Sequence, residues 1–173
     1  SRVSRGLGDV YKRQILFGWP LIQFFLLIGS LISICWFQHL TVPEAVILML
    51  VQGMITGAVG ITFAHELMHQ KTKLERFLAD ILMAMAFYGH FRTEHVFVHH
   101  RYVGTKKDAV TARFNESFYT FFLRVIPQCL ISAWSVEAQK LAAKNKSIFN
   151  MSNPFYIYAA LASLFVLLSF IIG

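Results

Sequence analysis

Charged residues are scarce in this sequence. Only 14% of its 173 residues are Asp, Glu, Lys or Arg, whereas 56% are hydrophobic and 15% are aromatic. A soluble domain typically carries about 25% charged residues. The shortage of charge therefore argues against an ordinary soluble protein and indicates a chain that lies in a lipid bilayer.

Three long stretches contain almost no charge at all. Residues 15–37 have none, residues 43–64 have only Glu44 near their start, and residues 155–172 have none. A helix rises about 1.5 Å per residue and a hydrocarbon core is about 30 Å thick, so about 20 apolar residues span it. We therefore predict an all-α, polytopic helical membrane protein with spans at these three places.

Cysteine is also rare, because only Cys35 and Cys129 occur. The two lie on opposite sides of the predicted bilayer, so we predict no disulfide between them. The sequence has no CxxC pair, which excludes the common thiolate metal sites.

The first fourteen residues, SRVSRGLGDVYKRQ, differ from everything that follows. They are basic and contain glycine, and the character of the chain changes abruptly at Ile15. We set residues 1–14 aside as a leader that is non-native or disordered. Residues 15–173 are predicted to form one partial membrane-embedded domain.

Basic residues are unevenly distributed between the predicted spans. The connector 38–41 has none, whereas the long segment after the second span contains Lys71, Lys73, Arg76, Arg92, Arg101, Lys106, Lys107, Arg113, Arg124, Lys140, Lys144 and Lys146. The positive-inside rule predicts that this segment faces the cytoplasm. The net charge of +7 is thus mainly a topology signal. Because the basic residues are dispersed among acids and aromatics, we predict no nucleic-acid binding.

Histidine forms two tight clusters in that basic segment, HELMH at residues 65–69 and EHVFVHH at residues 94–100. Neutral imidazole is the commonest protein metal ligand. Helical residues four apart share a face, so His65 is predicted to pair with His69 and His95 with His99, while His100 lies about 100° around the axis. Five imidazoles without cysteine exceed the needs of one tetrahedral zinc and favour a polynuclear site with the ligands His65, His69, His95, His99 and His100.

Two other histidines are left out of the predicted site. His39 lies in the predicted outer turn. His90, five residues before His95, can either face the site or cap a short helix. Three acids are candidates for contacts behind the ligands. Glu66 and Glu94 adjoin ligands, and Asp80 lies in an apolar stretch, 77–91, that is too short to cross the bilayer. Each acid can hydrogen-bond a ligand imidazole or have only a structural role, and Glu66 and Glu94 can also bridge metals.

The remaining segments are predicted to surround this site. Residues 101–115 are predicted to form a polar loop. Residues 116–146 are predicted to form an amphipathic helix along the membrane interface, with a kink at Pro127. Gly53 and Gly57 make a GxxxG pair that permits close helix approach in lipid.

The run FAHELMHQKTKLERFLADILMAMAFYGHFRTEHVFVHHRYVGTKKDAVTARFNESFYTFFLRV resembles the integral-membrane alkane 1-monooxygenases, within the superfamily of membrane di-iron fatty-acid desaturases and hydroxylases. That superfamily holds two irons with histidine boxes on the cytoplasmic side. The HxxxHH spacing after Glu94 is the hydroxylase form, whereas desaturases generally have HxxHH. The resemblance covers about residues 60–135, although Gln70, Val98 and Val110 depart from its usual Lys, Gly and Pro. It implies that the iron ligands are His65, His69, His95, His99 and His100.

The resemblance also implies the activity and its partners. The expected reaction is O2-dependent hydroxylation of the terminal methyl group of an alkane or similar apolar chain by a non-haem di-iron centre. Electrons are expected from rubredoxin or ferredoxin with its reductase. The expected location is a bacterial inner membrane, multi-pass, with the histidine boxes facing the cytoplasm. Because the family has further histidine motifs beyond the equivalent of Gly173, the chain is interpreted as an internal fragment.

Three alternatives stay open. A membrane fatty-acid desaturase or related lipid hydroxylase would have the same metal chemistry on a fatty acyl substrate. An intramembrane zinc metalloprotease would use HELMH, with Glu66 as general base, and needs a single zinc. A histidine-rich metal transporter would place its histidines within the spans rather than beside them.

Overall fold

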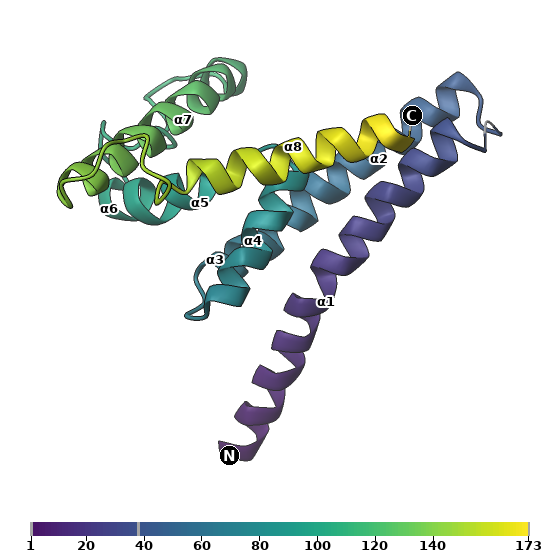
Figure 1. The fold of residues 1–173 in the computed structure, drawn as a ribbon, viewed down its shortest axis with the longest axis horizontal. Helices are drawn as coiled ribbons and strands as arrows, with labels where there is room; N and C mark the ends of the chain where they lie inside the picture. The colour runs from purple at the N-terminus through teal and green to yellow at the C-terminus, as the bar shows by residue number, and fades with distance from the viewer. Residues whose placement is uncertain (1, 38, 173) are drawn as a thin grey trace. The chain divides into compact units, whose positions relative to one another are not determined.

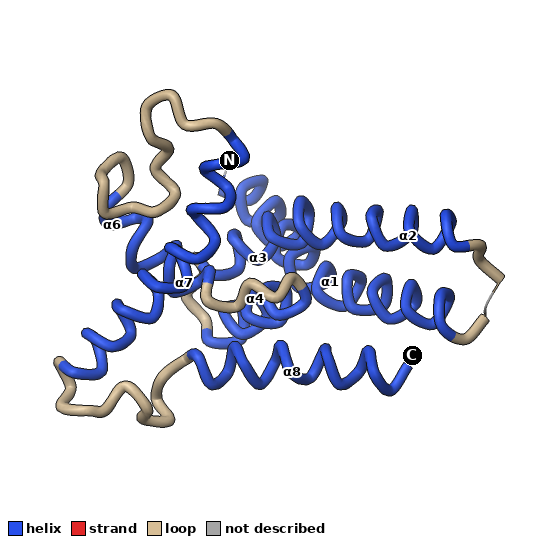
Figure 2. Tube along the Cα trace, turned by 90° about the horizontal axis from the view of Figure 1, so that it is seen from above, coloured by secondary structure: helices blue, strands red, loops and turns tan. Residues whose placement is uncertain are grey.

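In the computed structural model, which describes residues 2–37 and 39–172, all regular secondary structure is helical (Figure 2). Side chains are described from residue 11 onward. The prediction of an all-α fold is confirmed for these residues. The helices fall into two compact units, residues 1–87 with 161–173 and residues 88–160, and each unit is described on its own.

Among the described residues, three helices are long and apolar enough to cross a membrane: Tyr11–Cys35, Val42–Met68 and Phe155–Ile172. They confirm the prediction of a polytopic helical membrane protein. The first lies in α1 (Arg2–Cys35), the second comprises α2 (Val42–Met54), η1 (Ile55–Gly60) and α3 (Ile61–Met68), and the third is α8 (Phe155–Ile172). In Figure 1 these helices are the purple, blue and yellow coils.

The helical ends differ somewhat from the sequence prediction. Helix α1 continues upstream through residues 2–14, whose assignment as a non-native leader stays a prediction; Ser1 lies outside the described residues. The second span continues four residues beyond residue 64, to Met68, because HELM contains good helix formers and no breaker. The first histidine box therefore lies on the last turn of an apolar helix.

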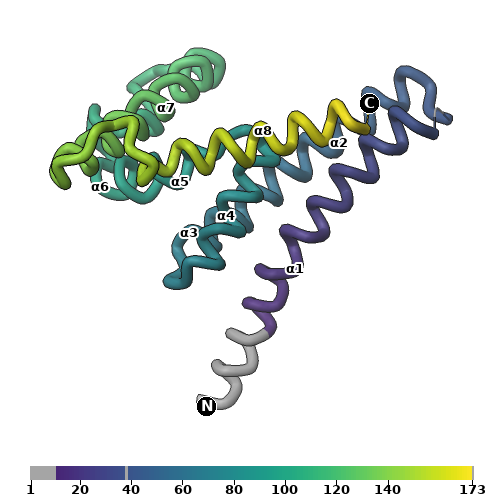
Figure 3. The backbone as a smooth tube through the Cα atoms, in the orientation of Figure 1, coloured from purple at the N-terminus to yellow at the C-terminus, as the bar shows by residue number. Residues whose placement is uncertain are grey.

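In the hairpin of α1 and α2–η1–α3 (Figure 3), Gly60 lies directly against α1. A Cβ at Gly60 would overlap the amide of Gln23, which is 0% exposed and accepts a 2.9 Å hydrogen bond from Trp19 Nε1. The Trp19 ring stacks on Phe63 with centroids 4.9 Å apart. By contrast, Gly53 and Gly57 have open space around their Cα atoms. The close helix approach predicted for the GxxxG pair occurs at Gly60 instead.

Helix α4 (Lys73–Met85) returns the chain after the first histidine box. Thr72 caps its N-terminus: its hydroxyl accepts a hydrogen bond from the Glu75 backbone N–H at 3.2 Å and donates one to the Glu75 carboxylate at 2.6 Å. The C-terminal end packs Ala84 and Met85 against Phe165 of α8. With 13 residues, α4 is too short to span a bilayer, as the sequence predicts.

The second unit contains α5 (Phe91–Glu94), η2 (His95–His99), α6 (His100–Tyr102), α7 (Phe118–Ala142) and the start of α8. Helix α7 continues through Pro127 as one element. Arg124 attaches the preceding loop to α7, because its guanidinium donates to both oxygens of Glu116 at 2.6 Å and to the Ala109 carbonyl at 2.8 Å. This hydrogen bonding lowers the pKa of Glu116 to about 2.

Candidate metal centre

The first histidine box lies at the C-terminal end of α3. His65 is in its last turn and His69 is its C-terminal cap. The two rings meet edge to face with centroids 4.8 Å apart. This is the arrangement that a spacing of four residues predicts on an α-helix, so the structure confirms that these two rings share a face.

A groove of about 290 Å³ adjoins this box. His65 contributes to its wall, together with the apolar side chains Ile15, Leu16 and Phe63. Glu66 lies at the same groove and forms an ion pair of 2.8 Å with Lys12. The Glu66 carboxylate, a predicted partner of a ligand imidazole, thus pairs with Lys12. The neighbouring His65 imidazole lines an apolar groove.

The second box is not a regular α-helix. Residues His95–His99 form a π-helix, η2, in which each turn holds one residue more than an α-turn and bonds run from i to i+5. His95 consequently aligns with His100, and their Nε2 atoms are 2.9 Å apart. The α-helical spacing of four predicts His99 beside His95, and these two rings do stack. The π-turn brings His100 to the same ring as well, which α-helical periodicity does not predict.

His99 has a different environment. Its ring stacks on His95 with centroids 5.2 Å apart, and its Nδ1 lies 3.0 Å from Asp108 Oδ2. Asp108 is 3% exposed and also accepts hydrogen bonds from the Thr111 hydroxyl at 2.7 Å and the Val110 N–H at 3.1 Å. Metal-binding histidines usually donate their other ring N–H to such a carboxylate. The nitrogen of His99 that remains available to bind a metal is therefore Nε2.

Asp108 is the residue that the sequence analysis missed. It lies in the DAVTAR segment, which was used only as part of the resemblance. The signal in the sequence was an acid in a polar loop nine residues after His99. Without the fold, nothing distinguishes this acid from other loop acids.

Glu94 precedes the second box and is 0% exposed. Neither of its carboxylate oxygens has a hydrogen-bond partner among the described residues. Burial, reinforced by the charge of Asp108, raises the pKa of Glu94 to about 7. A buried acid without a partner is costly, and a cation nearby would offset that cost.

The remaining sequence candidates are distributed as follows. Asp80 is 4% exposed on α4, and its predicted contact with a ligand stays a prediction. His90, which was left out, has a buried Nε2 without a hydrogen-bond partner in the described part of the chain, and burial lowers the pKa of this imidazole. His39 lies in the exposed turn before α2.

The donor chemistry of both boxes fits a transition metal. Two ring nitrogens that bind one ion at about 2.1 Å lie about 3 Å apart when the angle at the metal is near 90°, which is close to the separation in the His95–His100 pair. Imidazole suits iron, copper, zinc and nickel alike. The donors of both boxes are therefore chemically suited to a transition metal, without selecting the element.

Comparisons with known proteins give the family. A family model described as fatty acid desaturase matches residues 40–173. Alkane 1-monooxygenase 1 of Alcanivorax borkumensis is 37% identical over 148 residues, which are 79% of this chain and 36% of that protein. Alkane 1-monooxygenase of Ectopseudomonas oleovorans is 35% identical over 148 residues, 79% of this chain and 37% of that protein.

A further relative is named for a different substrate. The xylene/toluene monooxygenase hydroxylase component of Pseudomonas putida is 35% identical over 109 residues, which are 62% of this chain and 29% of that protein. The chain thus spans about a third of the length of the curated relatives it matches. With the family model covering most of the chain, and with the relatives that the sequence resemblance had indicated, the chain belongs to the fatty acid desaturase family.

Proposed function

We propose that this chain supplies histidine ligands to a non-haem di-iron centre that hydroxylates the terminal methyl group of an alkane or similar apolar chain, with O2 as co-substrate. The proposed ligands are His65, His69, His95, His99 and His100. The observation that carries the proposal is the pairing of imidazoles within each box. The alkane 1-monooxygenases among the relatives support the reaction class.

The two boxes are proposed to combine into one metal centre. His65, His69, His95 and His100 each offer one ring nitrogen to this centre, and His99 offers its Nε2 with Asp108 behind it. The buried Glu94 supports a cation in this region, because its carboxylate is not satisfied by hydrogen bonds. Iron is proposed over zinc or copper because of the family.

The residues of the chain have separate tasks in this reaction. When bound, the irons supply the activation of O2 needed to oxidise an unactivated C–H bond. The histidines hold the metal and resist oxidation better than thiolates would. Asp108 fixes the ring orientation of His99. The groove beside His65 offers apolar walls to the substrate end, where burial contributes about 0.8 kcal/mol per CH₂.

Topology and electron supply complete the proposal. The basic segment that carries both boxes is proposed to face the cytoplasm of a bacterial inner membrane, in agreement with the positive-inside rule. The electrons are proposed to come from rubredoxin or ferredoxin with its reductase, which would dock on this basic face. The bilayer delivers the apolar substrate.

The test is metal analysis with Mössbauer spectroscopy on the full-length protein. The variants His95→Ala and His100→Ala should lose iron and product formation, whereas the matched control His39→Ala, in the exposed turn before α2, should keep both. Two irons per chain and a primary alcohol from an alkane are expected. One zinc per chain would contradict the proposal and favour a protease, which Glu66→Gln would then inactivate.

A fatty-acid desaturase or related lipid hydroxylase is the second candidate, because the matching family model is that of the fatty acid desaturases. The metal site would be the same in both cases, so metal analysis does not separate them. The product does: an alkene in an acyl chain would indicate desaturation, and an alcohol at a terminal methyl group would indicate hydroxylation.

A further inference from the structure

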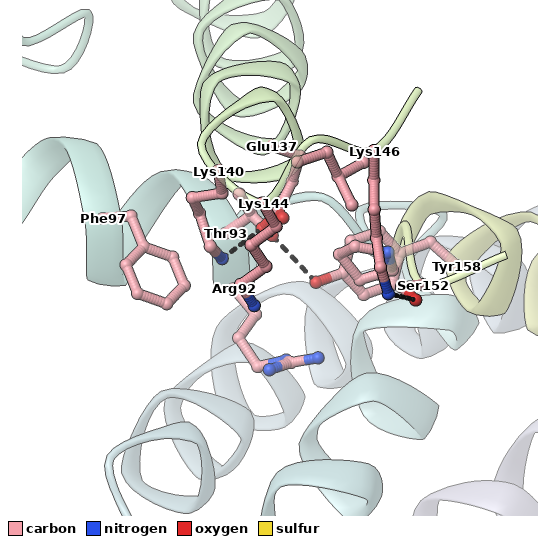
Figure 4. A pocket seen from close by; sticks show the side chains of 11 residues that line it. Arg92, Thr93, Phe97, Glu137, Lys140, Lys144, Lys146, Ser152 and Tyr158 are labelled. Carbon is pink, nitrogen blue, oxygen red and sulfur yellow. Dashed lines mark hydrogen bonds and ion pairs between the residues drawn. The ribbon is translucent and has the colours of Figure 1, made fainter. Parts of the chain in front are cut away.

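A cavity of about 300 Å³ lies in the second unit, apart from the proposed metal ligands (Figure 4). Its walls come from α5, η2, the C-terminal half of α7, the loop before α8 and the first turn of α8. Its lining contains one carboxylate, Glu137, and four cationic side chains, Arg92, Lys140, Lys144 and Lys146.

The floor of this cavity is rigidly built. The Thr93 hydroxyl lies 2.9 Å from Tyr158 Oη and 3.2 Å from Glu137 Oε1. All three residues are at most 6% exposed. Gly89 allows this packing, since a Cβ there would lie 2.9 Å from the Tyr158 Cβ. Such a buried hydrogen-bonded chain holds the walls in place before any ligand binds.

Two cations of the lining, Lys144 and Lys146, have no acidic partner among the described residues. Glu137 is already paired with Lys140 at 2.8 Å, and the Lys140 ammonium also lies 3.8 Å from the centroid of the Phe97 ring. Within the described part of the chain, Lys146 donates to the neutral hydroxyl of Ser152, at 3.1 Å, and to no acid. The Lys144 ammonium makes no hydrogen bond or ion pair with another described residue. A concave surface with such excess positive charge attracts anions.

The position of the cavity identifies the kind of anion. Pro154 and Tyr158, at the start of α8, form part of its wall. Helix α8 has 18 residues, which cover about 27 Å, so its ends must lie near the edges of the hydrocarbon core. The cavity therefore opens at the depth of the lipid headgroups.

The surroundings of the cavity agree with that depth. The loop before α8 exposes Phe149 and Met151, which are 72% and 82% exposed, and the first turn of α8 exposes Tyr156 and Ile157. Exposed aromatic and apolar side chains at the end of a span are typical of a membrane interface. A soluble acidic partner would have to insert its carboxylates among the headgroups to reach this cavity.

We propose that this cavity binds the phosphate of an anionic glycerophospholipid, with Lys144 and Lys146 facing the phosphodiester and the acyl chains lying against the apolar first turns of α8. Basic pockets at the ends of membrane helices bind lipid phosphates in this way. A zwitterionic lipid fits less well, because its own ammonium group would enter a cavity that already holds excess positive charge. This lipid site is independent of the proposed hydroxylation.

The experiment compares phospholipids on the full-length protein, purified in a zwitterionic detergent. Lipid that stays bound is quantified by extraction, and affinity is measured as the rise in Tm on titration with phosphatidylglycerol, phosphatidylcholine or inorganic phosphate. Wild-type protein should retain and be stabilised by phosphatidylglycerol. The double variant Lys144→Gln/Lys146→Gln should bind it about tenfold or more weakly, given about 1 kcal/mol per lysine near a membrane surface.

Two controls keep the result interpretable. Lys71→Gln/Lys73→Gln removes the same charge from exposed positions outside the cavity and should leave the affinity unchanged, and Lys144→Arg/Lys146→Arg should retain binding. Equal weakening in the Lys71/Lys73 variant would reduce the effect to overall charge and overturn the proposal. So would equal stabilisation by phosphatidylcholine or by inorganic phosphate, or lipid retention by the Lys144/Lys146 variant together with loss of an acidic protein partner.

Discussion

The two histidine boxes present their imidazoles through different helical geometries. In HELMH a regular α-turn brings His65 and His69 together, with ring centroids 4.8 Å apart. In HVFVHH a π-turn brings His95 and His100 together across five residues, with Nε2 atoms 2.9 Å apart. The extra residue in the second box therefore changes the helix type from α to π, while the first and last imidazoles of the box remain paired.

The π-turn makes two different histidine spacings equivalent. A π-turn is equivalent to an α-helix with one residue inserted. An HxxxHH box in a π-turn thus presents its first and last histidines as an HxxHH box would in an α-turn. The pairing of His95 with His100 depends on the fit between the number of intervening residues and the helix type.

The largest effect is expected from breaking that fit. Inserting one alanine between Val96 and Phe97 would move the paired histidines from five to six positions apart, a spacing that neither helix type aligns, so bound iron and product formation should fall. Deleting Val96, which is only half-buried, should restore an α-turn with a spacing of four and retain iron. Metal content per chain measures both variants, and loss of iron in both would contradict the equivalence of the two geometries.

A smaller effect is expected from substituting Asp108, which contacts His99 of the second box. Asp108→Asn keeps the shape but exchanges the charged acceptor of His99 Nδ1 for an amide, so metal affinity should fall about 10–100-fold. Competition with a chelator measures this affinity. Glu75→Gln is the buried-acid comparison at the cap of α4, and an equal loss in that variant would argue against a specific role of Asp108.

Sequence reasoning reached the fold class and the histidines from simple periodicities. Three stretches with at most one charge each predicted three apolar helices, and a spacing of four predicted the His65–His69 pair. It did not reach the π-turn, because residue spacing alone does not reveal an added residue in a helical turn. It did not reach Asp108 either, because the contact depends on how the loop folds back onto η2.

The loop that carries Asp108 should respond to pH through Glu116. Arg124 lowers the pKa of Glu116 to about 2, below its value of about 4.3 in an unfolded chain. This pair therefore stabilises the loop fully above about pH 4.3, and the stabilisation is lost as the pH falls toward about 2. Hydrogen exchange of residues 103–117 should rise over this window. In Glu116→Gln the exchange should be fast already at neutral pH, and a pH response that survives this substitution would assign it to another group.

The smallest predicted effect concerns the segment after the first box. Thr72 caps α4 through its hydroxyl, which accepts from the Glu75 N–H at 3.2 Å and donates to the Glu75 carboxylate at 2.6 Å. Thr72→Ala should destabilise the protein by about 1 kcal/mol, whereas Thr72→Ser, which keeps the hydroxyl, should cost much less; thermal unfolding measures both. Iron content should stay unchanged, because the cap lies three residues beyond His69 and acts on α4. If Thr72→Ala released iron as well, the first box would depend on α4 and not on its own α-turn alone. The contrast between the two boxes would then be smaller than their geometries indicate.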